Sequence, residues 1–170
     1  MNKINKKGET PLYWACKNNN FELVKILIKY GAKKSINTIN CSPLLAAYEN
    51  ENKQIMKYLL ENGADINQKV DKDGYSIIRY ACIDQNIRMV KFIIENGCDM
   101  YRQDSYGGIP FFYALGAGKI DIINLFIKYG VDINQEVAMD MTHVFSSELK
   151  SSFAINFFIS NEADIGKEVI

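Results

Sequence analysis

The chain has 170 residues, of which 48% are apolar and 24% charged, and its formal net charge is zero. This composition is typical of folded proteins and excludes pervasive disorder. No apolar run approaches the roughly 18 residues that a membrane-spanning helix needs, so we expect no membrane association.

The lysines are concentrated at one end of the chain. Residues 1–34 contain eight lysines and two glutamates, so the remaining residues carry a compensating acidic excess. A solvated lysine-rich end explains this pattern, and the alternative is an acidic partner that contacts this part of the chain. The isoelectric point of about 6.6 is well below that of a typical nucleic-acid-binding domain, so we expect no nucleic-acid partner.

The first predicted elements are a tight turn over residues 5–9 and a short helix. Gly8 supplies the left-handed backbone conformation of the turn. Thr10 can cap the helix with its hydroxyl, and Pro11 suits the first helical position. The helix ends near residues 18–19, and its apolar face consists of Leu12, Ala15 and Cys16.

A second helix is predicted from Phe21 to Tyr30. Its apolar residues recur on one side, whereas Glu22 and two lysines face water. Gly31 then ends the helix in the left-handed conformation. The apolar stripe consists of Leu23, Val24, Leu27 and Ile28.

This unit recurs with a period near 33 residues. A Gly-Ala pair or its substitute begins at residues 31, 63, 97, 130 and, in degraded form, 162, and a Thr-Pro-Leu-like mark lies 21 residues before each. Because the two motifs recur with the same period and a fixed offset, they predict stacked supersecondary units, each too small to fold alone. The turn residue Gly8 is matched by Asn40, Gly74 and Gly107, and Asn is among the few other residues that adopt left-handed geometry readily.

These marks resemble those of ankyrin-repeat proteins, whose pattern is a turn, Thr-Pro-Leu-His, two alanines, a helix pair and Gly-Ala-Asp. The best copies are GETPLYWACKNNNFELVKILIKYGA from Gly8 and CSPLLAAYENENKQIMKYLLENGADIN from Cys41. The resemblance implies an all-α solenoid of stacked antiparallel helix pairs with projecting hairpin fingers. We expect one ankyrin-repeat domain over residues 1–170, with repeats at about 5–36, 37–70, 71–103 and 104–135 and a degenerate fifth at 136–168.

The sequence departs from the family pattern in two respects. The fifth repeat has lost its turn glycine, its proline and both alanines, which fits either a polar terminal cap or a piece of a longer array. The histidine of the family motif is also replaced in every repeat, and we expect apolar contacts between repeats in place of its hydrogen bonds. The replacing residues are Tyr13, Leu45, Arg79, Phe112 and Val144.

Catalytic and metal-binding motifs are missing from the sequence. His143 has no cysteine or second histidine at ligand spacing, and no phosphate-loop lysine follows Gly107-Gly108. We therefore expect no enzyme activity, no cofactor and no metal. Cysteines 16, 41, 82 and 98 follow no disulfide spacing, which favours a reduced intracellular setting, cytoplasmic or nuclear, with a secreted effector as the alternative.

Aromatic residues recur at the position after the missing histidine. In the ankyrin arrangement this position and the fingers line a concave surface, and Trp and Tyr are frequent anchors of protein interfaces. The alternative is that these rings pack between repeats as core. The expected anchors are Trp14, Tyr75, Tyr80, Tyr106 and Tyr113, and the expected orienting charges are Lys7, Lys17, Glu49 and Asp73.

We therefore expect a monomeric, non-catalytic module that binds a protein partner on its concave surface, because a solenoid can vary that surface without disturbing its core. The alternative is that the repeats are the substrate-targeting arm of a larger enzyme or effector whose catalytic part lies outside this chain. The fold alone does not identify the partner.

Overall fold

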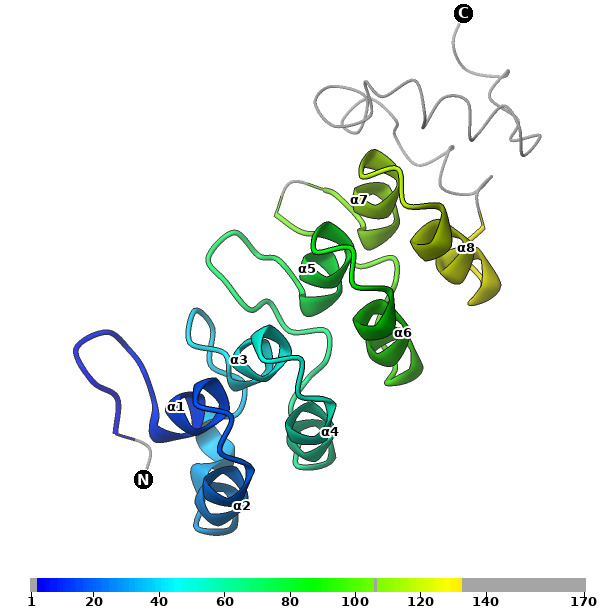
Figure 1. Cartoon of the computed structure of the whole chain (residues 1–170). Coiled ribbons are helices and arrows are strands. Elements are labelled where there is room, and N and C mark those ends of the chain that lie inside the picture. Colours follow the sequence, from blue (N-terminus) through cyan, green and yellow to red (C-terminus); the bar gives the residue numbers. More distant parts are fainter. Residues whose placement is uncertain (1–2, 106, 133–170) are drawn as a thin grey trace, which may run out of the picture. The chain divides into compact units, whose positions relative to one another are not determined.

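A computed structural model describes residues 3–105 and 107–132 of the chain (Figure 1). The predicted fifth repeat, His143 and Tyr106 lie outside the described residues. Over the described ranges the fold is all-α with no strand, as the sequence predicts. The elements are α1 (Pro11–Lys17), α2 (Phe21–Lys29), the short 3-10 helix η1 (Ala32–Ser35), α3 (Pro43–Glu49), α4 (Lys53–Glu61), α5 (Ile77–Ile83), α6 (Ile87–Glu95), α7 (Pro110–Gly116) and α8 (Ile120–Lys128). None of these helices is long and apolar enough to cross a membrane.

The chain divides into two compact units, and α5 begins in one and ends in the other. Unit 1 comprises residues 1–77 and 95–98, and unit 2 comprises residues 78–94 and 99–170. In unit 1, α1 packs against α2 and α3, and α4 packs against α3 and α2. We call α1 and α3, and the corresponding first helices α5 and α7, the inner helices. The loops that precede α1 and α3 extend on the side of these two helices, whereas α2 and α4 lie on the other side (Figure 1).

The helix starts follow the capping rules. The hydroxyl of Thr10 accepts a hydrogen bond from the backbone N–H of Tyr13 at 3.1 Å, and Ser42 accepts from Leu45 at 3.2 Å. These bonds satisfy backbone donors that the first helical turn leaves without partners. The second helices of these two repeats are capped in the same way by asparagine, Asn20 in α2 and Asn52 in α4.

The predicted left-handed turn positions are confirmed. Gly31 has a φ of 100° after α2, and Asn40 has a φ of 67° at the position where the other repeats have glycine. Gly8, Gly74 and Gly107 also have positive φ. The chain therefore reverses at the same point of each repeat that the structure describes.

Buried aliphatic side chains fill the space between the helices of each unit. In unit 1, Leu12, Leu44 and Ile55 come from three different helices and are fully buried. In unit 2, α7 packs against α8, and the rings of Phe111 and Phe126 meet edge to face with centroids 6.1 Å apart.

The prediction that Leu23 belongs to the buried stripe of α2 is wrong, because its side chain is 40% exposed. At the same register in the next repeat, Ile55 is 0% exposed. Among the described residues the first repeat has a neighbouring repeat on one side only, so one side of α2 remains in solvent. The other predicted stripe residues, Val24, Leu27 and Ile28, are buried as expected.

Polar side chains also connect successive repeats. The amide of Asn50, at the end of α3, donates to the carbonyl oxygens of Cys16 and Lys17 at 3.1 and 3.0 Å. Within the second repeat, Asn37 donates to the carbonyl of Gly63 at 3.0 Å. Because the last carbonyls of a helix lack partners within it, the Asn50 amide satisfies groups of α1 that the fold would otherwise leave to water.

The different environments of Leu23 and Ile55 predict different costs of truncation. Ile55→Ala should lower the free energy of unfolding by about 2–4 kcal/mol, because it leaves a cavity in the core. Leu23→Ala should lower it by about 1 kcal/mol or less, because much of that side chain is already in water. Urea denaturation followed by circular dichroism measures both, and equal losses would contradict the exposed position of Leu23.

Candidate functional site

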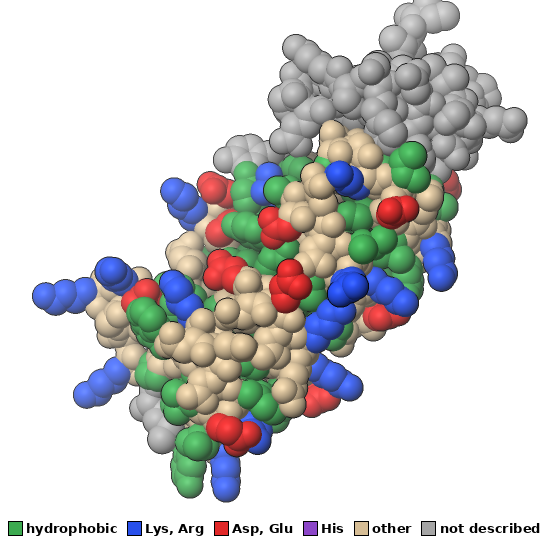
Figure 2. Space-filling model, in the orientation of Figure 1, with side chains coloured by type: hydrophobic (Ala, Val, Ile, Leu, Met, Phe, Trp, Pro, Cys, Tyr) green, Lys and Arg blue, Asp and Glu red, His purple; other side chains and the backbone are tan. Residues whose placement is uncertain are grey.

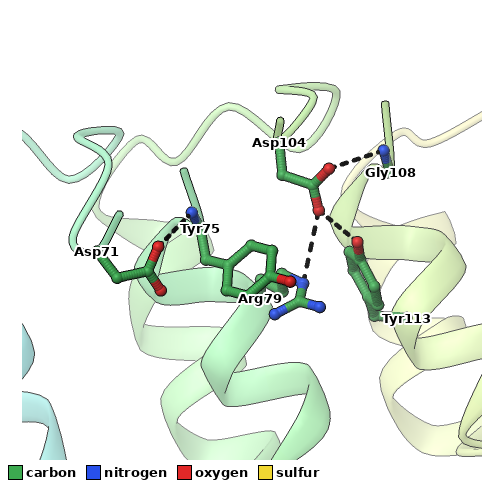
Figure 3. Close-up of polar contacts among 6 residues, drawn as sticks. All are labelled: Asp71, Tyr75, Arg79, Asp104, Gly108 and Tyr113. Carbon is green, nitrogen blue, oxygen red and sulfur yellow. Dashed lines mark hydrogen bonds and ion pairs between the residues drawn. The ribbon is translucent and has the colours of Figure 1, made fainter. Parts of the chain in front are cut away.

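The fingers are hairpins held by a polar side chain at their first position. In finger 3 (residues 71–75) the carboxylate of Asp71 accepts from the N–H of Tyr75 at 3.0 Å, and in finger 4 (residues 104–108) Asp104 accepts from Gly108 at 3.0 Å (Figure 3). Asn5 has this role in finger 1 (residues 5–9). The fingers therefore hold their residues in a defined turn close to the start of the inner helices.

Trp14 lies on α1 in unit 1, and its side chain is 42% exposed. The indole Nε1–H donates to Glu9 Oε2 at 3.2 Å, which links the ring to finger 1. Lys17 Nζ lies 5.5 Å from the ring centroid of Trp14 and 5.4 Å from that of Tyr13. It also donates to the hydroxyl of Tyr13 at 3.1 Å, so two aromatic rings hold the ammonium group in place.

The charged groups around Trp14 stabilise one another as ions. The hydrogen bond from Asn5 lowers the pKa of Glu9, and the bond from Trp14 and the nearby lysines lower it further. The hydrogen bond to Tyr13 raises the pKa of Lys17, and the charges of Glu49 and Glu9 contribute in the same direction. Both Glu9 and Lys17 are therefore ionised at neutral pH.

Finger 1 contacts finger 2 (residues 38–41) beside this cluster. The thiol of Cys41 donates to the carbonyl of Lys7 at 3.8 Å, and the side chain of Lys7 is exposed. We call Lys7, Tyr13, Trp14, Lys17 and Cys41 the Trp14 face. Three of the residues expected to bind a partner thus lie together in unit 1, and Glu49 is close enough to act electrostatically on Lys17.

Two more expected residues lie in finger 3 of unit 1. The side chains of Asp73 and Tyr75 are half-buried. The carbonyl of Tyr75 accepts from the N–H of Val70 at 2.8 Å, which closes the hairpin at its base. The backbone of this finger is therefore fixed by two hydrogen bonds at Tyr75, one to its N–H and one to its carbonyl.

In unit 2, Tyr113 and Arg79 share a carboxylate. The hydroxyl of Tyr113 donates to Asp104 Oδ2, and Arg79 Nε lies 3.5 Å from the same oxygen (Figure 3). The guanidinium carbon of Arg79 lies 4.2 Å from the ring centroid of Tyr113. Burial raises the pKa of the Tyr113 hydroxyl, and the hydrogen bond to Asp104 raises it further.

At Arg79, this cluster corrects the expectation that apolar contacts replace the missing histidine, whereas Phe112 at the same position of the next repeat is a buried apolar residue. Arg79 occupies the histidine position of its repeat, and it forms an ion pair and a cation–π contact instead. Tyr13, at the same position of the first repeat, bonds to Lys17. Sequence reasoning did not assign a role to Arg79 or Asp104, although a charged residue at the histidine position was a usable signal.

The aromatic position of the inner helices does not have one environment. Trp14 is exposed, so the alternative that it is a core residue is wrong. Tyr80 and Tyr113 are half-buried, and the small Ala46 is buried at this position of α3. The residue at this position is therefore exposed in α1, half-buried in α5 and α7, and buried in α3.

Within residues 3–105 and 107–132, no group of three or more histidine, cysteine or acidic side chains is arranged to hold a metal ion. The four cysteines are free thiols. Burial raises the pKa of Cys16 to about 12, so this thiol stays protonated and unreactive at neutral pH.

Paired short helices linked by hairpin fingers define a helical repeat protein, and comparison with known proteins identifies the family. The family described as "Ankyrin repeats (3 copies)" matches residues 1–70 and 67–137, so the chain belongs to the ankyrin-repeat family. A relative named as an ankyrin repeat protein from Rickettsia bellii (strain RML369-C) is 54% identical over 37 residues. That similarity covers 22% of this chain and 22% of the relative.

The shared carboxylate in unit 2 predicts a structural role for the Tyr113 hydroxyl. Tyr113→Phe should lower the free energy of unfolding by about 1.5 kcal/mol, because the Asp104 carboxylate loses a donor in a largely buried place. Tyr30→Phe removes a hydroxyl from an exposed ring and should leave stability nearly unchanged. Urea denaturation of the two variants side by side checks this, and equal stabilities would rule the role out.

The lowered pKa of Glu9 predicts a spectroscopic transition in acid. Trp14 is the chain's single tryptophan, so its fluorescence reports on the bond to Glu9. A carboxyl whose pKa is lowered in the folded state stabilises that state above its ordinary value of 4.5, and this stabilisation is lost as the pH falls through the folded value.

The fluorescence change of Trp14 should therefore have its midpoint below pH 4.5 and should be absent in Glu9→Gln. Circular dichroism over the same pH range separates this local change from unfolding. A midpoint at or above 4.5, or the same transition in Glu9→Gln, would show that Glu9 does not hold the indole.

Proposed function

We propose that this chain is a non-catalytic module that binds a partner protein through its fingers and inner helices. The observation that carries this proposal is the Trp14 face, where an exposed indole and an ionised lysine are held in place by neighbouring side chains. Tryptophan is among the residues that most often supply the binding energy of protein interfaces.

In unit 1 the residues that form the core differ from those that form the Trp14 face, which supports this proposal. The buried aliphatic residues Leu44, Ile55 and Leu59 hold the helices together, and none of them belongs to the Trp14 face. Substitutions on the face can therefore change binding without opening the core. Membership of the ankyrin-repeat family supports the same class of function, since its repeats generally bind proteins.

Each unit is considered by itself: the proposed contact residues of unit 1 lie in its fingers and inner helices, and those of unit 2 lie on its inner helices. In unit 1 they are Lys7, Trp14, Lys17, Glu49, Asp73 and Tyr75, and in unit 2 they are Tyr80 and Tyr113. The hydroxyl of Tyr113 is already bonded to Asp104, so this residue offers only part of its ring. Trp14 and Tyr80 are therefore the substitutions of choice.

A partner captured from cell extract and then purified should lose affinity when these anchors are removed. Trp14→Ala and Tyr80→Ala should each weaken binding about tenfold, the size typical of an interface anchor. The control is Tyr30→Ala, which removes an exposed ring at the end of α2 and is not among the proposed contact residues. Titration calorimetry measures the affinities, and circular dichroism verifies that each variant is folded. Equal affinity of all three variants would place the binding surface elsewhere.

A further inference from the structure

We propose that the Trp14 face recognises an acidic segment of the partner, with an Asp or Glu carboxylate on Lys17 and an adjacent apolar side chain on Trp14. This inference rests on the proposed protein-binding function and specifies the chemistry of the partner. It also assigns a use to the lysine-rich end of the chain.

Lys17 is arranged as an anion receptor. Its ammonium has three N–H donors, and one of them bonds to the hydroxyl of Tyr13. Among the described residues no carboxylate is in ion-pair contact with this ammonium. Because the bond to Tyr13 and the ring of Trp14 already restrain the group, an incoming carboxylate meets a lysine that has less conformational freedom to lose than an unrestrained one.

The surroundings of Lys17 favour negative charge on the partner. Residues 3–17 contain four lysines and one glutamate. That glutamate, Glu9, already accepts hydrogen bonds from Asn5 and Trp14 through the same oxygen. Figure 2 shows lysine side chains projecting from the part of unit 1 that contains finger 1. Lysines therefore outnumber carboxylates in residues 3–17, which favours negative charge on the partner even though Glu9 and Glu49 act on Lys17.

An apolar contact beside the charge is supplied by two exposed side chains. The indole of Trp14 is 42% exposed, and Ile39 on finger 2 is 56% exposed. Finger 2 touches finger 1 through Cys41 and Lys7, so Ile39 lies on a finger that adjoins the finger bonded to Trp14. A carboxylate next to a leucine, isoleucine or aromatic residue fits this combination.

The acidic residues of unit 1 argue for a short acidic segment rather than a nucleic acid. Glu49 acts on Lys17 from the end of α3, and finger 3 carries Asp71 and Asp73. A nucleic-acid backbone presents a long row of phosphates and requires a continuous basic track, which these carboxylates interrupt. A peptide can place its acid on Lys17 and continue with uncharged residues.

The test uses the full chain and the fluorescence of Trp14. The probe is a short synthetic peptide that contains glutamate and leucine in equal numbers, and its matched control has glutamine in place of every glutamate. The glutamate peptide should produce a saturable change in Trp14 fluorescence that weakens as salt is added, because exposed charges are screened. The glutamine peptide should bind about fivefold more weakly or not at all.

Two variants with the same change of charge separate a site from a general field effect. Lys17→Gln should weaken binding of the glutamate peptide about fivefold, the upper end for an exposed ion pair. Lys29→Gln removes a lysine from α2, where it lies over Tyr30, and should leave the affinity unchanged. Circular dichroism checks that both variants are folded.

Three results would overturn the proposal: equal binding of the two peptides, equal losses in Lys17→Gln and Lys29→Gln, or tighter binding of a single-stranded oligonucleotide than of the glutamate peptide. The failure of this inference is distinct from failure of the proposed function. If the captured partner requires Trp14 but is insensitive to Lys17→Gln and to salt, the acidic assignment fails and the protein-binding function stands. If its affinity depends on Tyr80 but not on Trp14, this inference fails and the protein-binding function stands. If its affinity depends on neither residue, both fail.

Discussion

Burial of apolar side chains between helix pairs is the constraint on which the rest of this structure depends. A pair such as α1 and α2 is too small to enclose a core, so Leu12, Leu44 and Ile55, from three helices of unit 1, are buried together. Stability therefore comes from contacts between neighbouring repeats as much as from within one. The Asn50 amide, which bonds to carbonyls of the adjacent repeat, reinforces these contacts at the end of α1.

In this arrangement the inner helices can form polar contacts on the side of the fingers. Position 13 and position 79 correspond in the repeat, yet one holds a tyrosine that supports a lysine and the other an arginine paired with Asp104. Both arrangements combine a cation with an aromatic ring, although they use different residues. In α7 the same position holds Phe112, which is buried in the core, so the environment of this position differs between repeats.

Much of the fold could be predicted because its signals are local. Thr10, Ser42, Gly31 and Asn40 act on the backbone within a few residues, so their roles follow from residue type alone. The exposure of Leu23 could not be predicted from the periodicity of α2, because it depends on whether a neighbouring repeat covers that side of the helix.

The candidate site was predictable only in part, for a related reason. The repeat register identifies the position of Trp14, but the sequence left open whether its ring is exposed or packed between repeats. The pairing of Arg79 with Asp104 joins an inner helix to the next finger across 25 residues of sequence. Local patterns contain no information about which side chains meet at such a separation. Residues at equivalent positions of different repeats can also differ in burial: Trp14 is exposed, whereas Ala46 at the corresponding position is buried.

The restraint of the Trp14 indole has a consequence for recognition. A tryptophan that is free to rotate would lose conformational entropy on binding, whereas this ring is already bonded to Glu9 through its nitrogen and flanked by Lys17. An exposed indole held by charged neighbours is therefore prepared for contact, and its polar edge is satisfied before any partner arrives. The remaining ring surface favours an apolar side chain, and the adjacent ammonium favours an acidic one, so one partner segment that carries both would satisfy the whole face.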